Sequence, residues 1–441
     1  MREEENKADL VAPLVSSDLQ SLEDDGIKGR SASVHSAVFN ISTTMIGAGI
    51  MSIPATMKVL GVIPGFALIV IVAYFVEATA EFMLKYTEIG KCTTYAGLMD
   101  ESFGKLGAVA VQVCAIVTQF GCLIVYLIII GDVLCGNQSG ETLHLGVLQE
   151  WFGNQWWTSR PFALIFIVLF IILPLVLLKH VDSLRYSSAL SILLAVMFVC
   201  ISLGMAISSM LQGKTHKIRL FPDFGSQHSI LAYFTTIPIF VTGLGFHVNV
   251  HLIRAGLGKP THMSSAVRIA LLICVLIYFA IGFSGYLLFG DSIMADILVN
   301  FDQNNDSKIA GILNDVVRLS YAIHLVLVFP VINFTLRANI DELVFSRRTA
   351  SLGGENTRFV FLTCVLLVLS YLMAVIIPNI WYFFQFIGST TIVCTSFIFP
   401  AAIVLRDVHG ISSTKDMVMG IMVIVLAVGT SSLAIYTNSN S

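Results

Sequence analysis

The sequence predicts an all-α membrane protein built from two inverted repeats of five transmembrane helices, with an eleventh helix after them. Hydrophobic residues make up 56% of the 441 residues and charged residues only 12%, whereas a soluble domain has about 25% charged residues. Apolar segments close to or above the ~20 residues that span a bilayer recur along the chain. Two of them, the first and the sixth, carry glycines near their middles, and this pairing indicates the inverted repeat.

Eleven apolar segments are expected to form the transmembrane helices. Residues 1–33 before them are polar and acidic, lack the apolar core and cleavage site of a signal peptide, and are predicted to form a disordered cytoplasmic tail. Helices 1 to 5 form the first repeat, 34–210, helices 6 to 10 form the second, 230–404, and helix 11 spans 416–436. The expected helices are 34–57, 64–87, 107–131, 161–178, 186–210, 230–253, 266–289, 312–336, 359–377, 380–404 and 416–436.

The distribution of basic residues predicts a cytoplasmic N-terminus and a C-terminus on the opposite, lumenal side. The side whose short loops hold more Lys and Arg is cytoplasmic, and this orientation places most of the 25 Lys and Arg residues there. Two Asn-x-Ser/Thr sequons outside the predicted helices, at Asn137 and Asn305, then fall in non-cytoplasmic loops. Lys214, Lys217 and Arg219 depart from the pattern because they lie on the predicted outer side.

Several classes of function are disfavoured by the composition. The net charge of −3 gives no reason to expect a nucleic-acid partner. The eight cysteines contain no Cys-x-x-Cys pair and lie mostly inside apolar segments, so no metal site, disulfide framework or cofactor is expected. A membrane enzyme needs convergent catalytic groups, but His35, His180, His251 and His262 are scattered singly. The chain is therefore not expected to be an enzyme.

The stretch Met-Ile-Gly-Ala-Gly-Ile-Met-Ser-Ile-Pro, from Met45 to Pro54, predicts a break in the first helix. Gly47 lies near the membrane midplane and permits backbone angles that unwind a helix. Pro54 has no N–H to donate, so the Ile50 carbonyl is expected to stay unpaired. Non-helical backbone at this depth is tolerated only where it is buried in protein or lines a cavity. The break therefore predicts a cavity with a polar occupant.

A second break is predicted in the sixth helix, at Thr242-Gly243-Leu244-Gly245-Phe246. Gly243 lies as deep in its helix as Gly47 does, and because five helices separate the two, the sixth enters the membrane from the opposite side. Paired breaks in inverted halves point to the binding site of a secondary transporter. The unwound segments offer N–H groups to a carboxylate and carbonyls to an ammonium, which fits an amino acid. The alternative is that these glycines only allow close helix packing.

Residues 36–54, Ser-Ala-Val-Phe-Asn-Ile-Ser-Thr-Thr-Met-Ile-Gly-Ala-Gly-Ile-Met-Ser-Ile-Pro, resemble the first helix of the amino acid/auxin permease family, and Phe246-His247 resembles part of its sixth. Within that family the chain is most similar to plant and fungal vacuolar amino acid transporters, whose relatives include the sodium-coupled neutral amino acid transporters. The resemblance implies the LeuT-type five-plus-five fold and cation-coupled amino acid transport. The substrate-binding residues that it implies are Thr43, Gly47, Ala48, Gly49, Ile50, Tyr126, Thr242, Gly243 and Phe246.

Departures from the family pattern favour a proton as the coupling ion, and the expected function is proton-coupled export of amino acids from the vacuole to the cytosol. Sodium-coupled relatives have Asn where Thr43 stands and hydroxyl residues on helix 8, where residues 320–330 here are largely apolar apart from Ser320 and His324. Ionisable groups within the membrane are functional candidates, and the unperturbed pKa of histidine lies between cytosolic and lumenal pH. The proton-coupling candidates are His324, His247 and Glu77, each with a purely structural role as its alternative.

Two other functions fit the same sequence. The chain could be a sodium-coupled neutral amino acid transporter at the plasma membrane, or an amino acid sensor built on a transporter fold. A sensor is expected to carry a sizeable partner-binding tail, and the acidic tail here is too featureless to decide. The identity of the amino acid stays open as well, because no basic residue is clearly placed in the predicted site.

Overall fold

The transmembrane spans occupy the positions that the sequence predicts. The structure is a computed structural model. Nine helices in the part of the chain that the structure describes are long and apolar enough to cross a membrane. The bent pair Val34–Met45 plus Ala48–Leu60 and the shorter apolar helix Arg160–Val176 fill the places of the first and fourth spans. The described residues are 34–139, 142–177, 185–222, 231–257, 260–302, 308–344, 356–377 and 379–439.

Short helices and breaks divide several spans into pieces. The first half of the chain contains α2 (Val34–Met45), η1 (Ala48–Ser52), α3 (Ile53–Leu60), α4 (Val62–Gly90), α5 (Tyr95–Cys135), β1 (Asn137–Ser139), β2 (Thr142–His144), α6 (Val147–Phe152), η2 (Trp156–Thr158), α7 (Arg160–Ile167), η3 (Val168–Ile172), α8 (Leu173–Val176) and α9 (Arg185–Leu211). The second half contains α10 (Leu231–Phe234), α11 (Ile237–Leu244), η5 (His247–Asn249), α12 (Val250–Ala255), η6 (Pro260–His262), α13 (Met263–Phe289), η7 (Gly290–Ser292), α14 (Ile297–Asn300), α15 (Lys308–Val344), α16 (Asn356–Ile376), α17 (Ile380–Ile387), η8 (Gly388–Ile392), η9 (Cys394–Ile398), α18 (Phe399–Arg406) and α19 (Thr414–Ser439).

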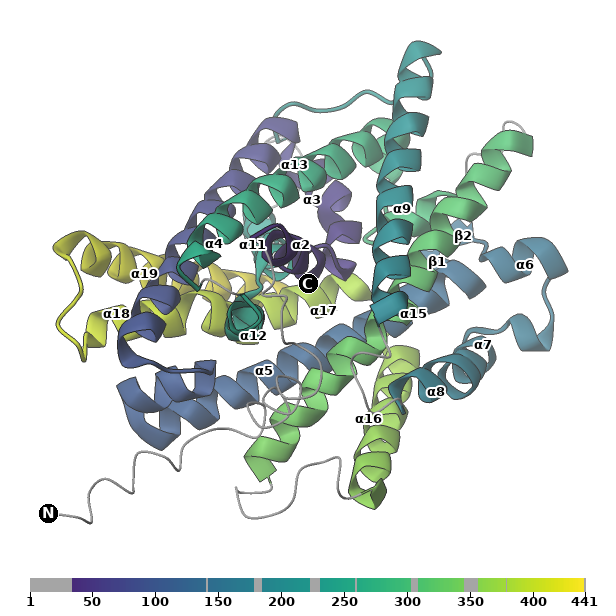
Figure 1. The fold of residues 1–441 in the computed structure, drawn as a ribbon. Helices are drawn as coiled ribbons and strands as arrows, with labels where there is room; N and C mark the ends of the chain where they lie inside the picture. Colours follow the sequence, from purple (N-terminus) through teal and green to yellow (C-terminus); the bar gives the residue numbers. More distant parts are fainter. Residues whose placement is uncertain are drawn as a thin grey trace, which may run out of the picture.

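The two broken helices lie in the middle of the bundle. Figure 1 shows α2 and α11 at its centre, with the long helices α5 and α15 running past them. Helix α13 packs on α2, α3 and α4, whereas α15 packs on α5 and α9, and α11 contacts η1, α4 and α17. Lipid-facing positions around this core carry exposed apolar side chains, as a membrane protein requires.

The first helix is broken at the position that its glycines predict. Helix α2 ends at Met45, η1 begins at Ala48, and the two pieces are bent by 52°. Gly47 between them has an extended backbone, with φ −121° and ψ −156°. The expectation that Pro54 leaves the Ile50 carbonyl unpaired was wrong, because the Ile53 N–H donates to that carbonyl through the tighter turns of η1.

The sixth helix is broken two residues later than the glycine on which the prediction centred. Gly243 stays helical within α11, and the extended residue is Gly245, with φ −74° and ψ 109°. A Cβ on Gly243 would lie 2.8 Å from Tyr278, and a Cβ on Gly49 would lie 2.8 Å from the Gly243 Cα. Gly243 therefore provides room for the two broken helices to touch, rather than unwinding its own helix.

Two local features were not predicted. Helix α5 begins at Tyr95 rather than at residue 107, and it is kinked at Gly104, whose φ of 67° is left-handed and suits glycine. The connection after α5 contains the antiparallel pair β1–β2 and the short helix α6. The predicted tail, residues 1–33, lies outside the described residues. The limits 34–210, 230–404 and 416–436 of the two repeats and the last helix stay predictions.

Candidate functional site

A cavity of about 410 Å³ lies where the two breaks meet. It extends from Gly47 and Gly245 along the inner half of the bundle to Asn40 near the start of α2 and Gly256 just after α12. We call this side of the bundle the inner end, and the side with the C-terminus of α5 and the N-terminus of α15 the outer end. No residue of α3, α13 or α14 lines the cavity, so it stops at the breaks and does not continue toward the outer end.

Tyrosine hydroxyls hold the carbonyl groups of the helix 1 break. Tyr278 donates to the Met45 carbonyl at 2.6 Å and lies 2.8 Å from the Gly243 carbonyl. Tyr321 donates to the Gly47 carbonyl at 2.8 Å. Among the described residues, the N–H groups of Ala48 and Gly49 make no backbone hydrogen bond. The break therefore keeps its carbonyls occupied and its N–H groups free for an anionic group.

Threonine hydroxyls at the same level offer acceptors. The Thr43 hydroxyl donates to the Phe39 carbonyl and the Thr242 hydroxyl to the Pro238 carbonyl, each within its own helix. A hydroxyl has one hydrogen and two lone pairs, so both oxygens are left as acceptors beside the cavity that they line. Free N–H donors and hydroxyl acceptors around one cavity are complementary to a carboxylate and an ammonium.

Six of the nine residues implied as substrate-binding line the cavity, and three do not. Ile50 and Phe246 are fully buried, and Gly243 lies behind the contact between the two helices. A Cβ on Gly47 would lie 3.1 Å from the Tyr126 hydroxyl, which forms the facing wall. The six cavity-lining residues are Thr43, Gly47, Ala48, Gly49, Tyr126 and Thr242.

Sequence reasoning missed several polar side chains of the cavity. Gln119 lies seven residues before Tyr126 on α5, a spacing that puts the two on one face of a helix. Gln119 and Asn339 are hydrogen-bonded at 3.1 Å, and Gln119 also contacts Thr335. The helical spacing from Tyr126 was a signal that could have found Gln119, whereas the contribution of Thr335 depends on the packing of α15 against α5.

Comparison with known proteins identifies the family. Residues 30–437 match the family model described as transmembrane amino acid transporter protein. The chain belongs to that family. It is 51% identical over 420 residues to the Arabidopsis thaliana protein named amino acid transporter AVT6C, covering 95% of this chain and 96% of that one. It is 25% identical to the Saccharomyces cerevisiae protein named vacuolar amino acid transporter 6, covering 84% of this chain and 89% of the relative.

The fold of this transporter is shared with a solved structure. The structure of MhsT in complex with L-phenylalanine superimposes with a TM-score of 0.57 at 15% identity, covering 92% of this chain and 99% of MhsT. That likeness concerns the fold alone. It confirms the LeuT-type arrangement of two five-helix repeats with an eleventh helix that the sequence predicts.

His324, the first coupling candidate, lies directly behind the cavity wall. Its Nδ1 is 2.7 Å from the Ser191 carbonyl, so Nδ1 carries the proton and donates it, and the Ser191 hydroxyl lies at 2.8 Å. The tautomer leaves Nε2 as a buried acceptor near the Ile46 carbonyl, and no described N–H or O–H donates to it. The ring also packs against Tyr321, with ring centroids 4.9 Å apart. His324 thereby contacts both the residue that holds the Gly47 carbonyl and a cavity-lining serine.

His247, the second candidate, fastens the inner half of helix 6 to α4. The Thr79 hydroxyl donates to the Phe75 carbonyl, so it accepts the Nε2–H of His247 at 3.0 Å. One helical turn later, His251 makes the same contact with Thr87 at 2.9 Å. The two His–Thr pairs hold η5 and α12 against α4, and neither histidine ring belongs to the cavity wall.

Glu77, the third candidate, lies away from the cavity. Its Oε1 forms an ion pair with the Arg268 Nε at 2.8 Å, and the same guanidinium binds Glu81. The Glu77 side chain keeps about a third of its surface exposed. An arginine between two carboxylates at the surface links α4 to α13. In the described part of the chain, no group of three or more His, Cys, Asp or Glu side chains is arranged to hold a metal ion.

Ion pairs close the outer end. Arg318, only 2% exposed, donates to both Glu150 oxygens at 2.7 and 2.8 Å and to Asp315 at 2.8 Å. Asp132 at the end of α5 is paired with Arg160. Burial raises the pKa of the Glu150 carboxyl even though Arg318 opposes the rise. These contacts tie α6 and α7 to α15 and α5 above the breaks.

Proposed function

We propose that this transporter moves neutral amino acids, coupled to protons, from the vacuolar lumen to the cytosol. The observation that carries the proposal is the cavity at the two helix breaks, with the free N–H groups of Ala48 and Gly49 on one side and the Thr43 and Thr242 oxygens beside them. No charged side chain lines that cavity among the described residues. A zwitterion without a charged side chain matches such a lining.

The proposed direction and membrane are supported by the distribution of basic residues and by a relative. The basic residues favour a cytoplasmic inner end, with the N-terminus on that side and the C-terminus in the lumen. A cavity that reaches the inner end while ion pairs close the outer end corresponds to an inward-facing state. The yeast relative is named a vacuolar transporter, and this supports the vacuolar membrane as the location here.

Proton coupling is supported by the surroundings of His324. The unpartnered Nε2 is an acceptor into which a proton can move, and Tyr321 connects the ring to the Gly47 carbonyl. Protonation changes the balance between outward and inward states only if the proton affinity of His324 differs between them. Movement of the helix 1 break would change the position of Tyr321 beside the ring and so supply that difference.

The test uses purified protein in liposomes with imposed gradients. A proton gradient, acidic outside, is expected to drive uptake of labelled alanine or glutamine, and an ionophore that collapses the gradient is expected to abolish it. A sodium gradient at equal pH is expected to drive none. Uptake that requires sodium and ignores protons would point to a sodium-coupled transporter instead. Liposomes without protein are the control.

A further inference from the structure

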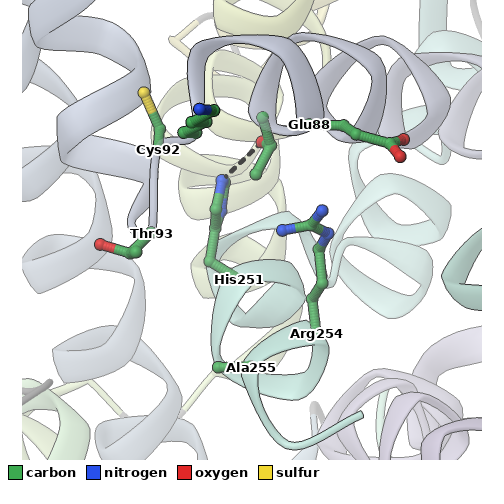
Figure 2. Close-up of a pocket in the computed structure, with 8 residues that line it drawn as sticks. Glu88, Cys92, Thr93, His251, Arg254 and Ala255 are labelled. Atoms are coloured by element: carbon green, nitrogen blue, oxygen red, sulfur yellow. Dashed lines mark hydrogen bonds between the residues drawn. The ribbon is translucent and has the colours of Figure 1, made fainter. Parts of the chain in front are cut away.

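A second cavity, of about 250 Å³, lies at the inner end between the turn that follows α4 and helix α12 (Figure 2). It shares no lining residue with the central cavity. Helix α12 separates the two: His251 and Arg254 line the second cavity, whereas Leu252 and Ile253 line the central one. A ligand in the second cavity would therefore contact the inner half of helix 6 without entering the central cavity.

Three charged side chains line this cavity without compensating one another. Lys91 and Arg254 are cations and Glu88 is an anion, and none of them makes a side-chain hydrogen bond or ion pair with another described residue. Figure 2 shows Arg254 extending from α12 toward the end of α4, between His251 and Glu88. The cavity thus offers two positive groups and one negative group to a ligand that arrives from the inner side.

A buried acceptor adds to this set. The Thr87 hydroxyl donates its hydrogen to the Met83 carbonyl at 2.6 Å, so it accepts the Nε2–H of His251 at 2.9 Å. Nδ1 of His251 is then a lone-pair acceptor, and it has no partner among the described residues although the residue is only 6% exposed. An unpaired buried polar atom costs free energy, and a ligand N–H would remove that cost.

We propose that the second cavity binds an acidic α-amino acid, such as glutamate or aspartate, as a regulator. Such a molecule carries two carboxylates for Lys91 and Arg254 and one ammonium, for which Glu88 and the His251 Nδ1 are acceptors. Because the ligand bridges the α4–α5 turn and α12, it holds the inner half of helix 6 in its present place. Bound regulator therefore favours the inward-facing state and slows the return step. The regulatory effect rests on the transport function proposed above, but binding does not.

Binding is measured first, on the purified full-length protein, with labelled glutamate and a saturating unlabelled neutral amino acid that occupies the central cavity. Wild type is expected to bind glutamate under these conditions. Arg254→Gln and Lys91→Gln are expected to weaken binding at least about tenfold, as loss of one charge-assisted contact does. Lys105→Gln, an exposed charge on α5 of the same end, is the matched control and is expected to bind like wild type.

Counterflow of labelled alanine in liposomes then tests regulation. Glutamate is expected to slow counterflow by wild type and Lys105→Gln but not by Arg254→Gln. Glutamate binding that the neutral amino acid displaces, or that survives in both Arg254→Gln and Lys91→Gln, would assign it to the central cavity and overturn the proposal. Succinate binding as tightly as glutamate would overturn the role of the ammonium. A wild type that binds glutamate but shows no counterflow counts against the transport function, not against the site.

Discussion

The helices around the central cavity are held by different chemistry at the two ends of the bundle. At the outer end, buried or half-buried ion pairs join the helices: Arg318 with Glu150 and Asp315, and Arg160 with Asp132. At the inner end, neutral hydrogen bonds such as that between His247 and Thr79 hold the cavity-lining half of helix 6 to α4. Ion pairs at this end, such as Arg268 with Glu81 and Arg358 with Asp341, join other helices. Removing one partner of an ion pair that is shielded from water is strongly destabilising. A single neutral hydrogen bond contributes little to stability.

Under the proposed function, the outer end is a closed gate whose opening separates charges. The inner end is then an open passage that helix movements close. Gly47 lies at the boundary between the two. Tyr321 holds its carbonyl, and its own N–H donates to the Met45 carbonyl directly before the free N–H groups of Ala48 and Gly49.

The largest effect is expected at the boundary itself. Gly47→Val should abolish amino acid uptake, because its Cβ would lie 3.1 Å from the Tyr126 hydroxyl and its branched methyl groups would fill the site. Gly429→Val is the matched control, since a Cβ there meets nothing within 4 Å. Uptake is measured in liposomes at equal protein content. Near-normal uptake by the Gly47 variant would remove this residue from the substrate site.

The second-largest effect is expected from opening the outer end. Arg318→Gln leaves Glu150 and Asp315 without their cation, and breaking a buried pair in this way costs about 3–5 kcal/mol. The inward-facing state should lose that stabilisation, so uptake should fall by at least about tenfold. Arg406→Gln, an exposed charge on α18, is the control. If both variants transport alike, the ion pairs at the outer end are not a gate.

The His324→Gln variant is expected to separate proton coupling from amino acid exchange. Glutamine keeps a hydrogen bond to Ser191 but does not titrate, so the variant should still exchange amino acid across the membrane. It should no longer accumulate amino acid when a proton gradient is imposed. The accumulation ratio in liposomes measures this directly. Accumulation with an unchanged pH profile would assign His324 a structural role.

A modest pH effect is expected at Glu150. Because burial raises the pKa of this carboxyl in the closed outer end, the closed end binds a proton more tightly than an open, hydrated one with an ordinary pKa of about 4.3. Lowering the pH toward that value should therefore favour the inward-facing state. Access to the central cavity is measured as the rate at which a thiol reagent labels a Thr335→Cys variant. Dividing this rate by that of the same variant with Glu150→Gln cancels the pH dependence of the reagent. A ratio independent of pH contradicts the assignment.

The smallest effect is expected at the inner end. Thr79→Val keeps the shape of the side chain and removes the acceptor of His247, which should cost on the order of 1 kcal/mol and lower Tm slightly. Thr430→Val is the control, since that hydroxyl bonds only to its own helix. Thermal unfolding of the purified protein compares the two. If Thr79→Val lowers Tm as much as Arg318→Gln does, the contacts at the inner end are not weaker than those at the outer end.

Much of the site could be predicted from local sequence. The apolar spans follow from composition, and the break in helix 1 follows from Gly47 and the residues around it. Unwound backbone at that depth is tolerated only where it is buried in protein or lines a cavity. The side chains that hydrogen-bond to the broken backbone of helix 1 could not be predicted. Tyr278 and Tyr321 are more than 200 residues away in the chain, and nothing local shows that their hydroxyls bind the Met45 and Gly47 carbonyls.

The break in helix 6 illustrates the limit more sharply. Two glycines, Gly243 and Gly245, are equally able to unwind a helix, and the choice depends on what each must pack against. Gly243 makes room for Tyr278 and Gly49, and Gly245 for Ile392. Likewise, the surface position of Glu77 follows from Arg268 on another helix. Sequence spacing finds residues that share a helix face, but not contacts between helices distant in the chain.

The central claim is that amino acids pass through the cavity at the two breaks, and counterflow tests it most directly. Liposomes that contain the purified protein and unlabelled alanine are diluted into a trace of labelled alanine, with no ion gradient. Transient accumulation of label is expected with wild type and with Gly429→Val, and none with Gly47→Val or without protein. Amino acid binding by a folded wild type that never exchanges label would contradict it and would indicate a sensor.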